Sequence, residues 1–354
     1  MHALHYAELE TWIERSGIGS SIEHQRRALE STGIECTQTP WVRNGNASMF
    51  STVLEQSRVL ADVDLVHCNT IGPSAGALIR YARYRGIPTI AHAHVTREDF
   101  AESFRWSGRI GRPLQWYLRW FYSQPDLVLC PSEYTRSVLE SYPVRAPIRT
   151  ITNGVDFSSL EGFESLRDEY RERYDLSGTV VFAVGNVFER KGLSTFCQLA
   201  RDTERDFVWF GPYDTGPHAG TEVRYWTNNP PDNLQFTGWI EDKRGAFAAG
   251  DVFCFPTKEE NQGISVLEAM ACGKAVVLRD IPVFDEFYTD GVDCLKCQTC
   301  QEFREAIDTL ADEPELRRRL GENAKETAAE HGLDRVGEEL ASIYRELVSG
   351  AKLS

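Results

Sequence analysis

The sequence lacks a run of apolar residues long enough to cross a bilayer, which excludes a membrane-spanning helix as the basis of its fold. Its first ten residues, MHALHYAELE, carry acids and no basic leader, so we expect no signal peptide and a cytoplasmic protein. No internal repeat recurs at a period of roughly 20–50 residues, which argues against a solenoid or a propeller.

Cysteine is present in a pattern that does not predict disulfide bonds. The nine cysteines are odd in number and spread along the chain, which argues against a disulfide framework. Cys294, Cys297 and Cys300 form C-x2-C-x2-C, but a zinc site needs a fourth ligand and no histidine is close in sequence. We therefore expect reduced thiols, with a metal site as the alternative.

Lysine is scarce, with 7 of the 38 basic residues, and the net charge of −15 argues against a protein that binds nucleic acid. The charge is also uneven along the chain. Residues 1–150 hold 16 arginines and 15 acidic residues, whereas residues 151–354 hold 22 basic and 38 acidic residues, a net charge of −16. This asymmetry indicates different partners for the two halves.

The length of 354 residues predicts two domains, because a single hydrophobic core stops growing below this size. Buried strands are expected at 3–7, 63–68 and 87–92, with a helix at 74–85 between the last two. A strand, a crossover helix and a second strand favour a parallel sheet, so the chain is predicted to belong to the α/β class. The C-terminal residues 301–348 are expected to be charged helices.

The most informative stretch is PTKEENQGISVLEAMACGKAVVL, residues 256–278. It places Glu260 on an expected strand-to-helix loop and Glu268 in the early turns of a helix that Gly273 ends. In an open α/β sheet such a loop lies at the carboxyl edge of the strands, where ligands bind against a helix N-terminus. Carboxylates there would accept hydrogen bonds from sugar or ribose hydroxyls, although two glutamates at this spacing also occur by chance.

A second loop of this kind lies in TVVFAVGNVFERKGL, residues 179–193, directly after an expected buried strand. Arg190, Lys191 and Gly192 lead from it into a helix. Cations at a helix start beside a strand end are suited to hold a diphosphate, and the alternative is an ordinary solvated loop.

Two segments of the first half also have the pattern of ligand-binding loops. Residues 16–20, with Gly17 and Gly19, are expected to form a turn between a strand and a helix, an order that cradles phosphates but that a plain turn shares. HAHVTREDF begins at the end of a strand, and strand alternation puts His92 and His94 on the same side. Either imidazole could carry a proton or bind a hydroxyl, or be an ordinary hydrogen-bonded loop residue.

Residues 103–125 contain no acid and combine arginines with aromatic residues. Pro113 is expected in the first turn of a helix whose residues Leu114, Tyr117, Leu118 and Phe121 form an apolar stripe. Such a helix is typical of a membrane surface, and an apolar stripe is equally typical of a helix packed on a core. The residues that would meet an anionic membrane are Arg105, Arg109, Arg112, Trp116, Arg119 and Trp120.

Residues 256–278, together with the order of the other motifs, resemble the hallmark of the retaining glycosyltransferases of family 4, which have the GT-B fold. IRTITNGVD, residues 148–156, resembles the junction between the two domains of that family, and the resemblance covers nearly the whole chain. Gln262 departs from the family pattern, which has an aromatic residue there, and Asn186 stands where the family has an arginine.

The resemblance implies two doubly wound Rossmann-like domains facing a cleft. The domains expected are an acceptor-side domain at 1–156, a nucleotide-sugar-binding domain at 157–332 and a C-terminal helix at 333–354 that crosses back to the first domain. Residues 279–287 resemble a loop that closes over the donor.

The resemblance also implies roles for single residues. Lys191 would neutralise the leaving diphosphate, Glu260 would hold the sugar hydroxyls, and His94, with His92 as the reserve, would contact the sugar or the acceptor. Glu268 would hold the ribose hydroxyls. The residues implied in donor binding are Gly17, Gly19, Asn186, Arg190, Lys191, Trp239, Ile240, Glu260, Gly263, Ile264 and Glu268. No cofactor and no metal ion are implied.

The activity implied is transfer of a hexose from a nucleoside diphosphate sugar to an acceptor hydroxyl, with retention of the anomeric configuration. The basic aromatic helix favours a lipid or a lipid-linked glycan as acceptor, with the protein on the inner face of the cell membrane, and a soluble acceptor is the alternative. Two other classes of protein stay open: a sugar-nucleotide epimerase on the same architecture, and a non-catalytic sugar-nucleotide-binding subunit.

Overall fold

The computed structural model describes residues 1–8, 15–38, 60–100, 107–216 and 219–350, of which 107–110 are described in their backbone only. The chain divides into two compact units. Unit 1 comprises Met1–Arg97, Gly111–Asn153 and Leu333–Ser354, and unit 2 comprises Glu98–Ile110 and Gly154–Gly332. The division lies at 153/154 rather than at 156/157, and Glu98–Ile110, which we expected in the first domain, groups with unit 2.

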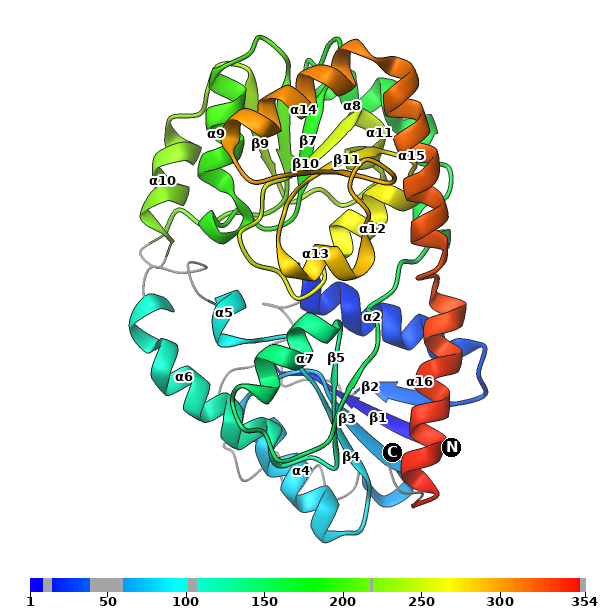
Figure 1. The fold of residues 1–354 in the computed structure, drawn as a ribbon. Helices are drawn as coiled ribbons and strands as arrows, with labels where there is room; N and C mark the ends of the chain where they lie inside the picture. The colour runs from blue at the N-terminus through cyan, green and yellow to red at the C-terminus, as the bar shows by residue number, and fades with distance from the viewer. Residues whose placement is uncertain (9–14, 39–59, 101–106, 217–218, 351–354) are drawn as a thin grey trace. The chain divides into compact units, whose positions relative to one another are not determined.

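Unit 1 is built on a six-stranded parallel sheet in the order β2-β1-β3-β4-β5-β6 (Figure 1). Its strands are β1 (His2–Tyr6), β2 (Glu35–Gln38), β3 (Leu65–Cys68), β4 (Thr89–His92), β5 (Leu127–Cys130) and β6 (Ile148–Thr150). Its helices are α2 (Gly17–Glu30), η1 (Leu60–Asp62), α4 (Pro73–Tyr84), α6 (Ser107–Tyr122), α7 (Glu133–Glu140) and α16 (Leu333–Val348). The short helix α5 (Arg97–Phe100) after Arg97, and α6 up to Ile110, group with unit 2. The expected strands and the β-α-β pattern are confirmed.

Successive residues along these strands serve two different cores, because side chains of a strand alternate between the faces of a sheet. Leu65 and Ile90 belong to a core with residues of α2 and α16, whereas Val66 and Ala91 belong to a core with residues of α4 and α6. The sheet is therefore covered on both faces, as a doubly wound sheet requires.

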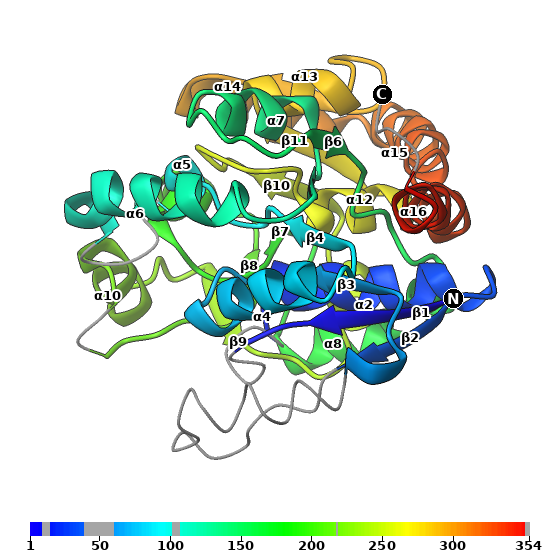
Figure 2. The ribbon, with the colours of Figure 1, turned by 90° about the horizontal axis from the view of Figure 1, so that it is seen from below.

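The C-terminal helix α16 packs on unit 1, as expected, and lies beside α2 (Figure 1 and Figure 2). The two helices approach closely at Gly337, where an added Cβ would sit 1.9 Å from the carbonyl oxygen of Ala28. Tyr344 reaches the sheet, because its hydroxyl lies 2.9 Å from Nε2 of His5 and 2.6 Å from Nδ1 of His67. A bidentate pair between Arg149 and Glu346 adds to this attachment.

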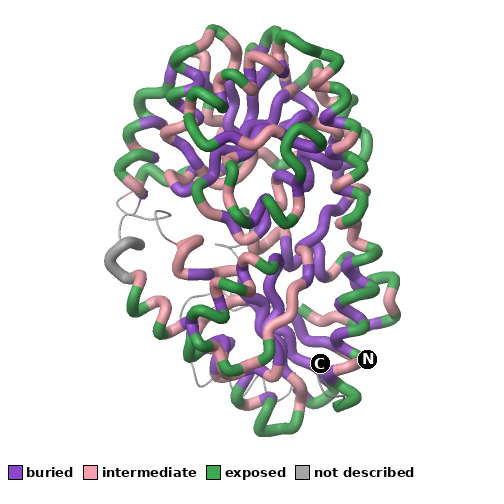
Figure 3. The backbone as a smooth tube through the Cα atoms, viewed as in Figure 1, coloured by how far each residue is buried: buried purple, intermediate pink, exposed green. Residues whose placement is uncertain are grey.

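Unit 2 contains a second six-stranded parallel sheet, in the order β12-β11-β10-β7-β8-β9. Its strands are β7 (Val181–Val184), β8 (Phe207–Phe210), β9 (Leu234–Gly238), β10 (Val252–Phe255), β11 (Ala275–Arg279) and β12 (Leu295–Cys297). Its helices are η2 (Ser158–Leu160), η3 (Phe163–Leu166), α8 (Arg167–Arg173), η4 (Glu189–Lys191), α9 (Leu193–Arg201), α10 (Thr221–Asn228), α11 (Arg244–Ala249), α12 (Ile264–Ala271), α13 (Pro282–Phe287), α14 (Cys300–Asp312) and α15 (Pro314–Ala329). In both units the strands are largely buried and the outward turns of the helices are exposed (Figure 3).

The expectations for Pro113 and for residues 279–287 are wrong. Helix α6 begins at Ser107, so Pro113 lies inside it rather than in its first turn. Proline in a helix interior removes one hydrogen bond, and here the burial of Leu118 and Phe121 offsets that loss. Residues 279–287 are not a loop, since Pro282 starts the short helix α13 after Ile281 in extended conformation.

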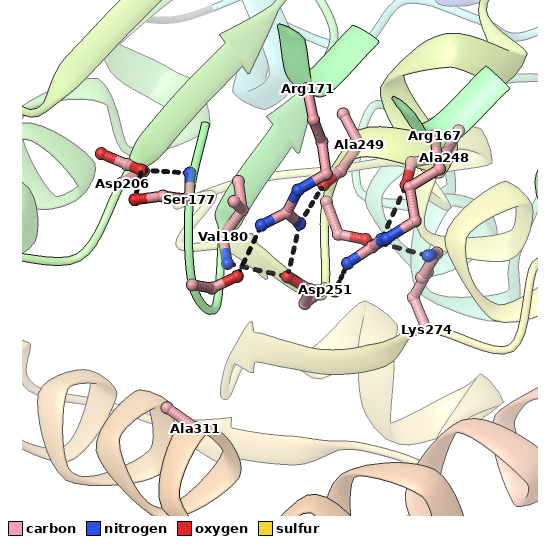
Figure 4. Close-up of polar contacts among 12 residues, drawn as sticks. Arg167, Arg171, Ser177, Val180, Asp206, Ala248, Ala249, Asp251, Lys274 and Ala311 are labelled. Carbon is pink, nitrogen blue, oxygen red and sulfur yellow. Dashed lines mark hydrogen bonds and ion pairs between the residues drawn. The ribbon is translucent and has the colours of Figure 1, made fainter. Parts of the chain in front are cut away.

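Ion pairs and hydrogen bonds connect the segments at the amino edge of the second sheet, as Figure 4 shows. The carboxylate of Asp251, just before β10, accepts hydrogen bonds from Arg167 at 2.7 Å, from Arg171 at 3.1 Å and from the backbone N–H of Val180 at 2.9 Å. Lys274, just before β11, donates to the carbonyl of Gly250 at 2.9 Å. These contacts hold the segments before β7, β10 and β11 together.

The buried lysine at this edge leads to a prediction about stability. Burial lowers the pKa of Lys274 to about 8, whereas in the unfolded chain the pKa is about 10.4. The unfolded state then binds more protons between these values, so the free energy of unfolding rises with pH in this window. Relative to Lys274→Met, the wild type is expected to gain roughly 1–3 kcal/mol between pH 7 and 10.5 in urea unfolding. Parallel pH profiles of the two proteins would contradict the assignment.

Candidate active site

The topology of unit 2 identifies one place on its sheet for a ligand. Strands β7, β8 and β9 extend to one side, and β10, β11 and β12 extend to the other, so the strand order reverses between β7 and β10. In open α/β sheets ligands bind outside the carboxyl ends of the strands at this switch point. The loops after β7 and β10 are the two that the sequence singled out, with Lys191 on one and Glu260 on the other.

A glycine holds these two loops together. Gly192 has φ +81, and an added Cβ would lie 2.1 Å from the carbonyl oxygen of Pro256. The backbone N–H of Lys258 donates to the carbonyl of Arg190 at 2.8 Å, and the hydroxyl of Thr257 donates to the same carbonyl at 3.3 Å. Only glycine fits the close approach, so residues 190–192 and 256–258 are fixed to each other.

Four charged side chains meet where the loops touch. Oε1 of Glu260 lies 3.2 Å from Nζ of Lys191 and 3.3 Å from Nη1 of Arg190. The same Nη1 lies 2.9 Å from Oδ1 of Asp99. Arg190 is 7% exposed and Glu260 is 7% exposed, so both are removed from water. The cluster carries two positive and two negative charges, which lets buried carboxylates stay ionised.

The pKa shifts follow from this balance. Burial alone would raise the pKa of Glu260, but Lys191 and Arg190 outweigh it and hold the pKa below its ordinary value. Burial raises the pKa of Asp99 despite Arg190 beside it. Nζ of Lys191 also lies 5.0 Å from the centre of the Phe255 ring, so the cation rests between a carboxylate and an aromatic face.

Helix α12 provides the second part of the site. Gly263 is its N-cap with φ +87, a left-handed conformation that favours glycine. Glu268, in the second turn, is 6% exposed and its Oε1 accepts from Nζ of Lys243 at 2.6 Å. The positions expected for Glu260, Glu268 and the helix end at Gly273 are confirmed, since α12 spans Ile264–Ala271 and Gly273 has φ +65.

The other residues of unit 2 that the resemblance implies in donor binding follow strands at the same carboxyl edge. Asn186 follows β7, and Trp239 and Ile240 follow β9 directly. Trp239 is 46% exposed. Asn186, Arg190, Lys191, Trp239, Ile240, Glu260, Gly263, Ile264 and Glu268 therefore all belong to unit 2, and the contacts above join Arg190, Lys191 and Glu260.

Gly17, Gly19 and His94 belong to unit 1. The expected turn at residues 16–20 is wrong, because Ser16 is an extended N-cap and α2 begins at Gly17, so both glycines are in its first turn. His92 and His94 lie on one side of the strand, as expected, with their rings stacked at 4.3 Å.

Burial favours the neutral form of His92 and His94 in the folded protein. Burial lowers the pKa of His94 to about 3, although part of its surface is exposed, and lowers the pKa of His92 as well. Nε2 of His94 lies 3.0 Å from Oδ1 of Asn69, which fits a donor N–H on that nitrogen. A neutral imidazole with a fixed tautomer is suited to hydrogen-bond a hydroxyl rather than to pair with a charge.

Three partners of the site escaped sequence reasoning. Asp99 meets Arg190 across 91 positions of sequence, Lys243 meets Glu268, and Asn69 meets His94. Asp99 lies in the HAHVTREDF segment, which the sequence marks as a possible ligand-binding loop, but the sequence does not indicate its ion pair with Arg190. A single sequence carries no pattern that links residues so far apart.

The thiols at 294, 297 and 300 do not add to the site. Cys294 and Cys297 are buried, and burial raises the pKa of Cys297 to about 12. Within the described ranges, no group of three or more His, Cys, Asp or Glu side chains is arranged to hold a metal ion.

Comparison with known proteins agrees with this geometry. Residues 167–327 match the family model for glycosyl transferases group 1, and residues 17–159 match that for glycosyltransferase family 4. The chain is 31% identical to the processive diacylglycerol alpha-glucosyltransferase of Acholeplasma laidlawii, over 98% of this chain and 99% of that protein.

Two solved structures share the fold at 16% sequence identity. They are sucrose-phosphate synthase from Thermosynechococcus elongatus, with a TM-score of 0.80 over 99% of this chain and 100% of that one, and Anabaena HepE in complex with UDP-glucose, with a TM-score of 0.76 over 98% and 100%. The protein has the two-domain GT-B fold. It belongs to the group 1 glycosyltransferases.

Proposed function

We propose that the protein transfers a hexose from a nucleoside diphosphate sugar to a hydroxyl of a lipid acceptor, with retention of the anomeric configuration. The observation that carries the proposal is the cluster of Lys191, Arg190 and Glu260 at the switch point of unit 2. It combines a cation for a diphosphate with a carboxylate for sugar hydroxyls within 3.3 Å of each other. The likeness to a diacylglycerol alpha-glucosyltransferase over nearly the whole chain supports the lipid acceptor.

The donor would lie along the carboxyl edge of the second sheet. Its diphosphate would meet Lys191 and the first backbone amides of α12 after Gly263, since helix N-termini attract anions. Glu268 would accept hydrogen bonds from the ribose hydroxyls, with Lys243 holding its carboxylate in place. The exposed indole of Trp239 would contact the base.

The chemistry asked of these residues is mainly electrostatic. The bond between the sugar anomeric carbon and the diphosphate oxygen breaks, and the electron pair leaves with the diphosphate. Lys191 would stabilise that developing negative charge, and Glu260 would stabilise the oxocarbenium-like sugar and orient its hydroxyls. The acceptor oxygen then bonds to the anomeric carbon, and its proton passes to the leaving diphosphate. Arg190, paired with Asp99 and Glu260, would be a positioning residue rather than a direct phosphate ligand.

The acceptor side of the proposal rests on unit 1. No helix in the described part of the chain is long and apolar enough to span a bilayer. Helix α6 has one side of a helix packed on a core and another side typical of a helix at a membrane surface. Leu118 and Phe121 are buried and Leu114 and Tyr117 pack on the core, whereas its outer side exposes polar and aromatic residues. The exposed residues are Arg112, Trp116 at 72%, Arg119 and Trp120 at 41%. Arg105 and the side chain of Arg109 lie outside the described residues.

This outer side of α6 predicts weak binding to anionic membranes. Each arginine near an anionic surface contributes about 1 kcal/mol, so Arg112→Ser with Arg119→Ser should weaken vesicle binding roughly 10–30-fold. The measurement is co-sedimentation with vesicles containing phosphatidylserine. The matched control is Arg318→Ser with Arg319→Ser, which removes the same charge from exposed positions of α15. Equal losses in both double variants would show nonspecific charge attraction and contradict a surface on α6.

The direct test is an assay with labelled sugar nucleotide and dioleoylglycerol in mixed micelles. UDP-glucose is the first donor to try, because the fold neighbour from Anabaena was solved with it. Label in the lipid, with the anomeric configuration of the donor, is the expected result. Isomerisation of the sugar nucleotide without acceptor would instead indicate an epimerase, and binding without turnover would indicate a non-catalytic subunit.

A further inference from the structure

The sheet of unit 1 has a switch point of its own. The strand order β2-β1-β3-β4 means that β1 leads to one side and β3 leads to the other. The carboxyl ends of β1 and β3 are neighbours, since the backbone N–H of Asn69 donates to the carbonyl of Tyr6 at 2.7 Å. Because ligands of open α/β sheets bind at the switch point, a ligand of unit 1 would bind outside the carboxyl ends of β1 and β3.

Glu8 stands at this switch point. Its backbone N–H donates to the hydroxyl oxygen of Thr70 at 2.8 Å, which joins the loops after β1 and β3. Its carboxylate accepts a hydrogen bond from the backbone N–H of Ala75, in the first turn of α4. It also lies against Gly72, the N-cap of α4, where an added Cβ would be 1.6 Å from Oε2 of Glu8. The protein's own carboxylate thus occupies the helix end that would otherwise attract a phosphate.

The side-chain amide of Asn69 gives a second, independent indication of a ligand at this switch point. Asn69 directly follows β3 and is 1% exposed, and its Oδ1 lies 3.0 Å from Nε2 of His94. Its Nδ2 has no hydrogen-bond partner among the described residues. Buried amide donors are rarely left unpaired, so this one points to a ligand group that completes it. A hydroxyl oxygen near His94 would serve both side chains.

Helix α6 is linked to this switch point by a hydrogen bond. The hydroxyl of Tyr117 in α6 donates to the carbonyl of Ile71, in the loop between β3 and α4. Tyr117 is neighbour to the exposed Trp116 and Trp120 on the same helix. A lipid acceptor in a bilayer that α6 contacts would therefore place its headgroup near Glu8.

We propose that Glu8 determines the class of acceptor: it admits an uncharged headgroup that carries hydroxyls and excludes a headgroup that carries a phosphate at the same place. The inference rests on the proposed function, because it assigns the acceptor of that reaction to unit 1. Burial raises the pKa of the Glu8 carboxyl, whereas hydrogen bonds from the backbone N–H groups of Ala75 and Ser74 and from Tyr6 favour its charged form. The charged carboxylate repels a second anion at short range, and a lone pair that these donors leave open accepts a hydrogen bond from a hydroxyl. The acceptor is then of the diacylglycerol class rather than the glycerophospholipid class.

The test compares two soluble lipids with the same chains, dihexanoylglycerol and dihexanoyl phosphatidylglycerol, by calorimetric titration of the full-length protein. Glu8→Gln keeps the shape and an oxygen for the N–H of Ala75 but removes the charge. The ratio of the two affinities is expected to shift toward phosphatidylglycerol by roughly tenfold or more in this variant. The control Glu30→Gln, an exposed position at the end of α2, should keep the wild-type ratio.

Several results would overturn the inference. They are an unchanged ratio in Glu8→Gln, a wild type that binds phosphatidylglycerol as tightly as dihexanoylglycerol, or no binding of either lipid to any variant. Glu8→Ala, checked for folding by thermal unfolding, should shift the ratio in the same direction. A transfer assay on the same samples separates the two proposals. Selective binding without transfer would refute the proposed function alone, and transfer to dihexanoylglycerol with an unchanged ratio would refute the role of Glu8 alone.

Discussion

Replacing Lys191 by methionine is expected to lower kcat/KM for glycosyl transfer by roughly 10²–10³-fold, the cost of removing one charge stabiliser from a preorganised site. The same variant should bind UDP more weakly by about tenfold, because a charge-assisted contact to the diphosphate is lost. The reason is geometric: Nζ of Lys191 lies 3.2 Å from Glu260 and against the Phe255 ring, at the switch point between β7 and β10. Steady-state kinetics and calorimetry measure the two effects.

The matched control is Lys258→Met. Lys258 belongs to the adjoining loop and pairs with Glu189 at 2.9 Å, but its side chain is 42% exposed and is not part of the cluster. Its substitution should change kcat/KM by less than about threefold, as surface ion pairs contribute little. An equal loss of kcat/KM in the two variants would mean that transfer depends on the structure of the loops rather than on the ammonium group of Lys191.

Glu260→Gln is expected to lower kcat/KM by a similar roughly 10²–10³-fold but to leave UDP binding unchanged or tighter. Removing the carboxylate leaves Lys191 and Arg190 with a surplus of positive charge, which favours a diphosphate. The sugar hydroxyls and the positive charge that develops on the sugar lose their partner at the same time. The two substitutions therefore separate binding of the diphosphate from transfer of the sugar.

Glu259→Gln is the control for this second variant, since it makes the same change one residue earlier. The carbonyl of Glu259, rather than its carboxylate, accepts from Arg190, so that contact survives the substitution. Transfer should stay within about threefold of the wild type, as for most substitutions outside a named interaction. Donor turnover at the wild-type rate in Glu260→Gln would refute the role given to that carboxylate.

Much of the fold was predictable because its signals are local. Gly273 ends α12 in a left-handed conformation, and Ser132 caps α7 by accepting from the backbone N–H of Thr135. The strands were visible as short runs of β-branched and aromatic residues. Where the prediction failed, tertiary packing outweighed a local preference. Pro113 lies inside α6 because Leu118 and Phe121 are buried in the core that α6 shares with α4.

The site was predictable in its types of residue but not in its pairing. Sequence order alone placed Lys191 and Glu260 on loops at a sheet edge, because parallel strands align their carboxyl ends. That Arg190 is buried between Asp99 and Glu260, and that Glu8 fills the start of α4, depend on contacts between distant segments. No spacing in a single chain encodes such contacts.

The most direct measurement is a crystal structure of the protein with an intact nucleoside diphosphate sugar. The account predicts that a diphosphate oxygen lies about 2.7–3.2 Å from Nζ of Lys191, with sugar hydroxyls at a similar distance from the Glu260 carboxylate. A diphosphate bound anywhere else, for example at the start of α2 or α4 in unit 1, would contradict it.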